Sequence, residues 1–140
     1  AILVAIALPP FLESISRSRR SDAQVALGGL AAAMERHFSS QPSFSATYAT
    51  AAASVSAPTD TCTNCGAPRI FPTQAPLDGS TKFYNLVIVS ADKAGFTLSA
   101  TRISPGAQAN DRCGDFTLTS TGVRGIANAL TGLTWQDCWR

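Results

Sequence analysis

The chain has 140 residues, a length that fits one domain of ordinary size and leaves little room for two separate cores. Apolar residues make up 45% of the chain and charged residues only 14%, a balance that excludes an intrinsically disordered protein. The formal net charge of +2 is too small for nucleic acid to be expected as the main partner.

The chain begins with eight consecutive apolar residues, Ala1–Leu8. This run is shorter than the ~20 residues that a helix needs to span a bilayer, and it lacks the basic start of a signal peptide. We therefore expect the sequence to begin within a longer hydrophobic segment. Pro9 and Pro10 follow, and each is expected to open or bend a helix because proline lacks a backbone N–H.

A long N-terminal helix is predicted from the spacing of the apolar residues. They recur every three or four positions, apart from one polar gap, at Leu12, Ile15, Ala23, Leu27, Leu30, Met34 and Phe38. A helix over residues 1–38 is ~57 Å long, which exceeds what a head of ~100 residues covers. We expect residues 1–22 to protrude and residues 23–140 to form the globular head. The gap holds Arg17, Arg19 and Arg20, followed by Asp22. We interpret these residues as a solvated or interfacial collar on the helix, or as an ordinary exposed face.

The segment from Ser39 to Leu77 shows no periodicity and contains five prolines, which predicts a long connecting loop. A short helical turn near Tyr48–Ser54 and a bridge between Cys62 and Cys65 are expected to organise it, because long loops in compact domains need such anchors.

The remainder of the chain is predicted to form an antiparallel sheet of about four strands. Two β-rich runs flank a turn at Asp92–Gly95, and further strands are expected later in the chain; the predicted strands are 83–89, 96–101, 115–120 and 133–139. The alternation leaves one apolar face, and the stretch Ala23–Phe38 is the available cover. The predicted fold class is therefore α+β, with a long N-terminal helix packed on the sheet.

Four cysteines in a short chain indicate two disulfides and an oxidising compartment, with three pairings open. The spacing of Cys62 and Cys65 also fits half of a zinc site, but Cys113 and Cys138 are too far apart to form the other half. A thioredoxin-like redox pair is disfavoured by the Thr- and Pro-rich surroundings of the first two cysteines. We expect structural disulfides and no bound metal.

No catalytic constellation is found in the sequence. His37, the only histidine, has no nucleophile or metal motif with it, and Glu13 and Glu35 are interpreted as part of a solvated helix face. Trp135 and Trp139 could stack on a ligand, but we expect them to complete a core. The chain is therefore predicted not to be an enzyme and to need no cofactor.

Two stretches of the sequence resemble type IV pilins. Residues Ala1–Pro9 are similar to the second half of the hydrophobic segment with which pilins begin. Asp111–Gly114, Leu118, Gly122 and Asp137–Arg140 resemble the C-terminal signature of the minor pilins whose chains end in Cys-Trp. The resemblance implies a cleaved and N-methylated leader junction followed by a glutamate. Those residues lie outside this sequence, so no processing site is assigned.

The resemblance implies a structural subunit, major or minor, of a type IV pilus that serves adhesion, twitching motility or DNA uptake. Such a subunit polymerises with other pilins into an extracellular filament and resides in the inner membrane before assembly. The expected filament interface comprises the apolar residues of the helix start: Ala1, Ile2, Leu3, Val4, Ala5, Ile6, Ala7, Leu8, Pro9, Phe11, Leu12 and Ile15. The family pattern also implies a disulfide between Cys113 and Cys138, which leaves Cys62 and Cys65 as neighbours to pair.

Two alternatives remain open at this point. The first is a minor pilin that binds DNA or a host surface, with Arg102, Arg112, Arg124 and Arg140 as its basic residues. Acidic residues are interleaved with these arginines, so they do not form a clear basic stripe. The second alternative is a pseudopilin of a type II secretion system, which the four cysteines and the Cys-Trp ending disfavour.

Overall fold

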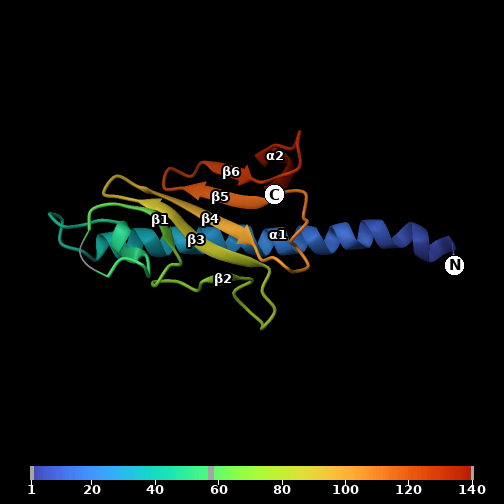
Figure 1. Ribbon diagram of the computed structural model, residues 1–140, viewed down its shortest axis with the longest axis horizontal. Helices are drawn as coiled ribbons and strands as arrows, with labels where there is room; N and C mark the ends of the chain where they lie inside the picture. The colour runs from blue at the N-terminus through green and yellow to red at the C-terminus, as the bar shows by residue number, and fades with distance from the viewer. Residues whose placement is uncertain (1, 57–58, 140) are drawn as a thin grey trace.

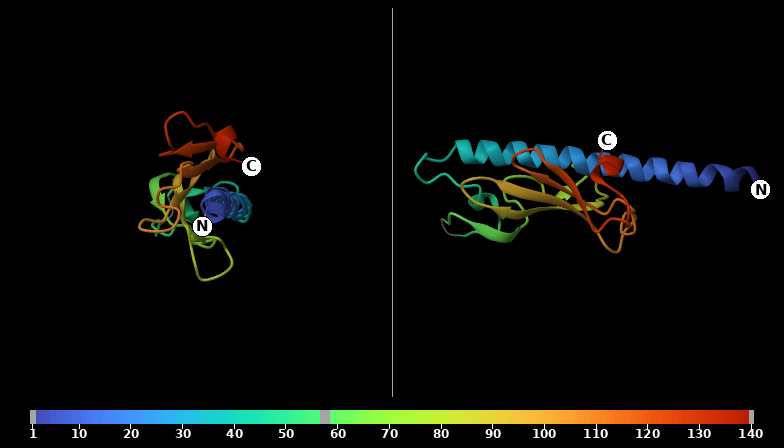
Figure 2. Two further views of the ribbon diagram at one scale, coloured as in Figure 1. Left: turned by 90° about the vertical axis from the view of Figure 1, so that its right-hand side faces the viewer. Right: turned by 90° about the horizontal axis from the view of Figure 1, so that it is seen from above.

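The N-terminal helix dominates the shape of the molecule. In the computed structural model, which describes residues 2–56 and 59–139 and the side chains from residue 8 onward, helix α1 spans Ile2–Ser39. Its second half lies along one face of a β-sheet, while its first half extends beyond the rest of the chain (Figures 1 and 2). We call residues 2–15 the stem, residues 16–22 the neck and the globular part from residue 23 onward the head.

Helix α1 is not opened at Pro9 or Pro10, in contrast to the sequence-based expectation. The two prolines remove only the helical hydrogen bonds of their own missing N–H groups, whereas the residues before and after the pair still carry an N–H. Helical structure therefore continues on both sides of the proline pair.

The sheet has six strands, more than the four or so that were predicted. The strands are β1 Cys62–Gly66, β2 Gln74–Ala75, β3 Tyr84–Ala91, β4 Phe96–Arg102, β5 Asp115–Thr119 and β6 Arg124–Ala127. They run antiparallel in the order β1-β3-β4-β5-β6, with β2 beside β3. Together with α1, they confirm the α+β class and the long helix on an antiparallel sheet.

The segments between these elements correct the prediction in two places. The expected loop before residue 77 contains β1 and β2, as well as the predicted turn, a 3-10 helix η1 at Ala49–Ala51. The expected closing strand at 133–139 is instead a short helix, α2 Trp135–Cys138. The carboxylate of Asp137 accepts hydrogen bonds from the backbone N–H and the hydroxyl of Thr134, at 2.8 and 2.9 Å. This capping pattern starts a helix and is incompatible with an extended strand.

The core lies between α1 and the sheet, as the apolar stripe predicted. Ala23, Ala26, Leu27, Leu30 and Met34 of α1 and Tyr84, Leu86, Ile88, Leu98, Ala100 and Phe116 of the sheet are at most 1% exposed. Phe38, also predicted to be buried, is half-buried and stacks on Tyr48 with ring centroids 4.4 Å apart. The head thus has its own core, formed without the stem.

Candidate functional site

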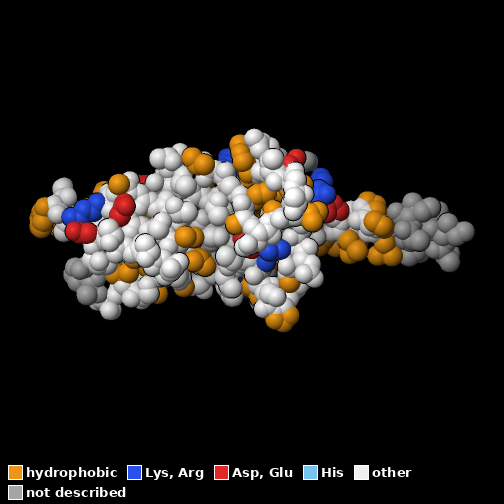
Figure 3. Space-filling view, turned by 45° about the horizontal axis from the view of Figure 1, so that its top comes forward, with side chains coloured by type: hydrophobic (Ala, Val, Ile, Leu, Met, Phe, Trp, Pro, Cys, Tyr) orange, Lys and Arg blue, Asp and Glu red, His pale blue; other side chains and the backbone are white. Residues whose placement is uncertain are grey.

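The stem exposes a group of large apolar side chains. Leu8, Phe11 and Leu12 are 46%, 62% and 55% exposed, and Pro9 and Pro10 are exposed as well. Orange side chains gather on this part of the helix in Figure 3, outside the surface of the head. Ile15, closer to the head, is half-buried.

The other residues of the predicted filament interface, Ala1 and the side chains of residues 2–7, lie outside the described part of the structure. Among the described residues, no helix is both long enough and apolar enough to cross a membrane. The exposed side chains of Leu8, Phe11 and Leu12 form an apolar surface on a helix that leaves the head.

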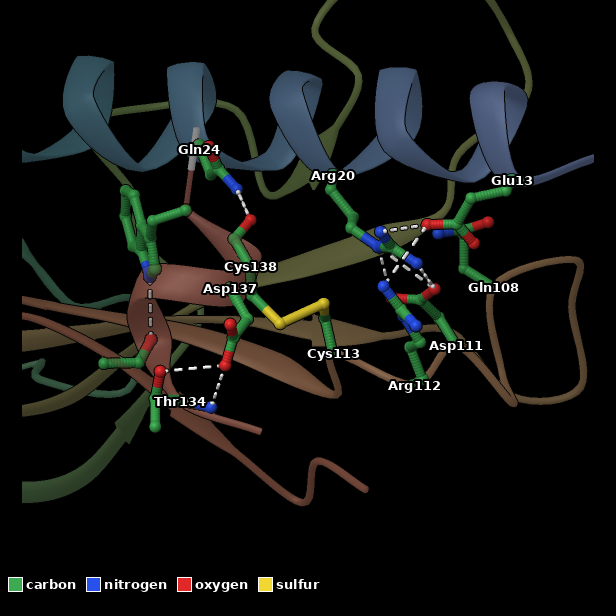
Figure 4. Close-up of a disulfide and its surroundings, with 12 residues drawn as sticks. Glu13, Arg20, Gln24, Gln108, Asp111, Arg112, Cys113, Thr134, Asp137 and Cys138 are labelled. Atoms are coloured by element: carbon green, nitrogen blue, oxygen red, sulfur yellow. Dashed lines mark hydrogen bonds and ion pairs between the residues drawn. A yellow bond between two sulfur atoms is a disulfide. The ribbon is translucent and has the colours of Figure 1, made fainter. Parts of the chain in front are cut away.

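At the neck, α1 carries a buried arginine that is bound by two carboxylates. Arg20 is only 4% exposed. Its Nε donates to both oxygens of Asp111 at 3.1 and 2.9 Å, its Nη2 donates to Asp111 Oδ1 at 2.5 Å, and its Nη1 donates to Glu13 Oε1 at 2.9 Å. Arg112 Nη2 lies 3.9 Å from the same oxygen of Glu13. We call Glu13, Arg20, Asp111 and Arg112 the neck cluster (Figure 4).

The neck cluster is electrostatically matched. The hydrogen bond to Asp111 raises the pKa of Arg20 above its ordinary value, against the opposing effect of burial. The hydrogen bond from Arg20 lowers the pKa of Glu13 below its ordinary value. A buried charge is tolerated in a protein only when it is paired and hydrogen-bonded in this way. The expected solvated collar is therefore wrong for Arg20.

A second set of polar contacts joins the neck to the loop that precedes Asp111. The Nε2 of buried Gln108 donates to the hydroxyl of Tyr84 at 3.2 Å, and its Oε1 accepts from Arg19 Nη1 at 3.4 Å. The guanidinium of Arg19 also lies 4.2 Å from the ring centroid of Phe83. Burial raises the pKa of Tyr84 to about 12. This loop is thus attached to both the helix and strand β3.

Both predicted disulfide pairs are present in the structure. Cys113 and Cys138 are bonded, as are Cys62 and Cys65. The first bridge lies beside α1, where Gln24 Nε2 donates to the carbonyl oxygen of Cys138 at 2.9 Å (Figure 4). The second bridge lies within edge strand β1. The pairing of β1 with β3 is irregular there, because its register shifts between Thr63 and Gly66.

The four arginines that were considered as DNA-binding residues lie in different environments. Arg102 binds the carboxylate of Asp115 and donates to the carbonyl oxygens of Ala109 and Asp111 at 3.1 and 3.0 Å. It also donates to the carbonyl oxygen of Asn128 at 3.4 Å, so this arginine links two loops and has few donors left for a phosphate. Arg112 faces Glu13, Arg124 is exposed, and Arg140 lies outside the described residues.

The two tryptophans also differ. Trp139 is half-buried, packs edge-on against Phe116 with centroids 5.6 Å apart, and donates its indole N–H to Gly125 at 2.9 Å. It completes the core, as expected. Trp135 is 41% exposed and lines a shallow hollow with Val123 and Arg124. The guanidinium of Arg124 lies 5.4 Å from the ring centroid of Trp139, so cationic and aromatic groups meet at this surface.

His37 lies in a structural setting. Its Nε2 is 2.8 Å from the hydroxyl oxygen of Thr50. Burial and, to a smaller extent, the charge of Arg69 lower the pKa of His37. Within residues 2–56 and 59–139, no three His, Cys, Asp or Glu side chains are grouped so as to hold a metal ion.

The neck cluster is the feature that sequence reasoning missed, although the sequence carries a signal for it. Arg20 lies three residues before Ala23 and so continues the buried positions 23, 27, 30 and 34 of the helical stripe. A charged residue in register with a core stripe indicates a buried ion pair. Its partner Asp111 is 91 residues away, and no spacing rule connects the two.

Comparisons with known proteins give the family. A solved structure of a type IV pilin from Shewanella oneidensis is similar, with 27% identity, a TM-score of 0.46 and coverage of 89% of this chain and 98% of that one. A comparison with curated proteins gave no match. The model of a family described as type IV minor pilin ComP, DNA uptake sequence receptor, matches residues 9–117. The chain belongs to this family of type IV minor pilins and is a pilin subunit.

Proposed function

We propose that the chain is built into a type IV pilus through its stem, which is covered by the helices of neighbouring pilins. The observation that carries this proposal is the exposure of Leu8, Phe11 and Leu12 on a helix that extends beyond the head. Burying apolar surface contributes ~25 cal/mol per Å², so these side chains alone offer several kcal/mol to a partner.

The geometry favours an open polymer. Where the stem packs on a different face of its neighbour's helix, the contact joins unlike patches, and such contacts propagate instead of closing on themselves. Before assembly, the inner membrane is the environment that would accommodate the apolar helix start. The mature location is the extracellular filament, and the family match favours a pilus subunit over a secretion pseudopilin. The same match supports a structural role without catalysis.

The test compares two exposed phenylalanines in the full chain. Phe11→Asp should reduce the amount of this chain in sheared pili at least tenfold, because the stem can no longer be buried. Phe44→Asp is the matched control, since Phe44 is 88% exposed in the loop after α1 at the opposite end of the head. Equal incorporation of the two variants would contradict the proposal.

DNA binding is a second candidate function. The family is described as a DNA uptake sequence receptor. Arg124 is exposed, has no carboxylate partner among the described residues, and lies beside exposed Trp135, which supports a phosphate contact next to an aromatic surface. Loss of one phosphate contact should reduce the slope of affinity against salt by about one. Arg124→Ala should show this change in a DNA-binding titration, and Arg36→Ala, which removes another exposed arginine, should not.

A further inference from the structure

Helix α1 loses its apolar packing at the neck. From the middle of the helix towards the stem, the side chains of Leu30, Leu27 and Ala23 are completely buried. Arg20 is the last buried residue in this direction, and all described side chains before it are half-buried or exposed. Polar contacts therefore take over from apolar packing where the helix leaves the head.

Two residues of α1, one helical turn apart, bind the two segments that the C-terminal disulfide joins. Arg20 binds Asp111, two residues before Cys113, and Gln24 binds the carbonyl oxygen of Cys138 (Figure 4). The disulfide joins these two segments to each other below the helix in the view of Figure 4. We propose that Arg20 and Gln24 are positioning residues that, together with this disulfide, fix the direction of the stem relative to the head. This proposal rests on the proposed role of the stem in assembly.

The helix needs such a restraint because it contains a soft point. Gly28 and Gly29 are adjacent in α1, and Gly28 is exposed with open space where a side chain would lie. Glycine weakens a helix by ~1 kcal/mol relative to alanine, and adjacent small residues are a usual place for a helix to bend. On the stem side, a tilt is opposed by the core contacts of residues 23–27, by the bonds of Arg20 and Gln24, and by the weaker contacts of Arg19 and Glu13 with the head.

A small tilt has a large effect at the end of the stem. Leu8 lies 20 residues before Gly28, a distance of ~30 Å along the helix. A tilt of ~10° at the glycines then displaces Leu8 by ~5 Å, about one helical turn. Helix packing depends on side chains that interdigitate within their own size, so such a displacement removes the match between neighbouring stems.

The test measures the direction of the stem in the isolated full chain. Nitroxide labels at Leu12 and at Ala94, which lies in the turn between β3 and β4, report the distance between stem and head by pulsed EPR. The pair Arg20→Gln with Asp111→Asn removes both charges and so leaves neither one buried and unpaired. It should at least double the width of the distance distribution and reduce the chain in sheared pili at least tenfold. The melting temperature should fall by only a few degrees.

Matched variants separate positioning from general stability. Arg17→Gln removes an exposed arginine of the same helix and should leave the distribution and the pili unchanged. Arg20→Lys keeps the charge but offers one nitrogen in place of three, so its distribution should be broader than that of the unchanged chain and narrower than that of the double variant. If the double variant does not fold, Gln24→Ala decides, because it removes the hydrogen bond to the carbonyl oxygen of Cys138 at a half-exposed residue and should also broaden the distribution.

Two results would overturn the proposal. The first is a narrow distribution in both the double variant and Gln24→Ala. The second is a broad distribution with normal incorporation into pili, which would show that stem direction does not limit assembly. Neither result touches the proposed function, which is tested separately by comparing Phe11→Asp with Phe44→Asp.

Discussion

The hydroxyl of Tyr48 donates a hydrogen bond of 2.9 Å to the carboxylate of Glu35, which ties the turn at η1 to helix α1. Burial, followed by the hydrogen bond and the charge of Glu35, raises the pKa of Tyr48 to about 12. Tyr84, the only other tyrosine, has a pKa raised to about 12 chiefly by burial. Both tyrosines therefore resist ionisation in the folded protein.

This relationship predicts a delayed alkaline titration. The absorbance at 295 nm should show almost no tyrosinate below pH 11 in the folded chain, whereas the urea-unfolded chain should titrate near its ordinary pKa of ~10. Because the folded pKa values are raised, their contribution to stability is complete below pH ~10 and is lost as the pH rises towards about 12. Fully buried Tyr84 should account for up to ~3 kcal/mol of this loss. A folded chain that titrates near pH 10 would refute the prediction.

The core on α1 predicts a contrast between two positions five residues apart. Leu30→Ala should lower the free energy of unfolding by ~2–5 kcal/mol, because a completely buried leucine leaves a cavity. Val25→Ala should change it by less than ~0.5 kcal/mol, because Val25 is 68% exposed. Urea unfolding followed by circular dichroism measures both. Similar losses at the two positions would mean that α1 lies on the sheet in a different rotation.

The sequence predicted the parts of this fold that repeat with a regular period. The stripe 23–38 and the alternating sequences of β4 and β5 have that property, whereas β3 was predicted from its β-branched and aromatic residues. Strands β1 and β2 have no regular period, because β2 has only two residues and β1 is irregular at its disulfide. Both strands depend on pairing with the distant strand β3. Local alternation carries no information about such pairing. The helix α2 carries a readable signal, Thr134 followed three residues later by Asp137.

The neck cluster predicts a non-additive pair of substitutions. Arg20→Met should cost ~3–5 kcal/mol, because Asp111, whose side chain is 4% exposed, is left as a buried charge without its main partner. Adding Asp111→Leu should recover most of that loss, because two apolar residues of similar volume replace a buried ion pair well. Denaturant unfolding of the two single variants and the double variant measures the coupling. Additive losses would show that the two residues act independently.

The C-terminal disulfide predicts a loss of stability that follows from its loop. Cys113 and Cys138 are 25 residues apart, for which the loop-entropy model gives ~3.5 kcal/mol. Cys113→Ala with Cys138→Ala should lose about this amount, and Cys62→Ala with Cys65→Ala should lose less because that loop is much shorter. Thermal unfolding measures both, and peptide mapping without reductant checks the pairing. A larger loss from the shorter loop would contradict this order.

The last prediction separates the two halves of one helix by placing the same charge at two leucines. Leu27 is completely buried in the head, so Leu27→Asp should unfold the chain, because a carboxylate in an apolar core has no partner there. Leu8, 19 residues earlier, is 46% exposed on the stem, so Leu8→Asp should leave the melting temperature within a few degrees of that of the unchanged chain. Its incorporation into pili should nevertheless be lost, because neighbouring subunits would have to bury the new charge. Thermal unfolding by circular dichroism and immunoblots of sheared pili measure the two effects separately. If Leu8→Asp lost folded stability but still entered filaments normally, the stem would belong to the core of the head and not to the assembly surface.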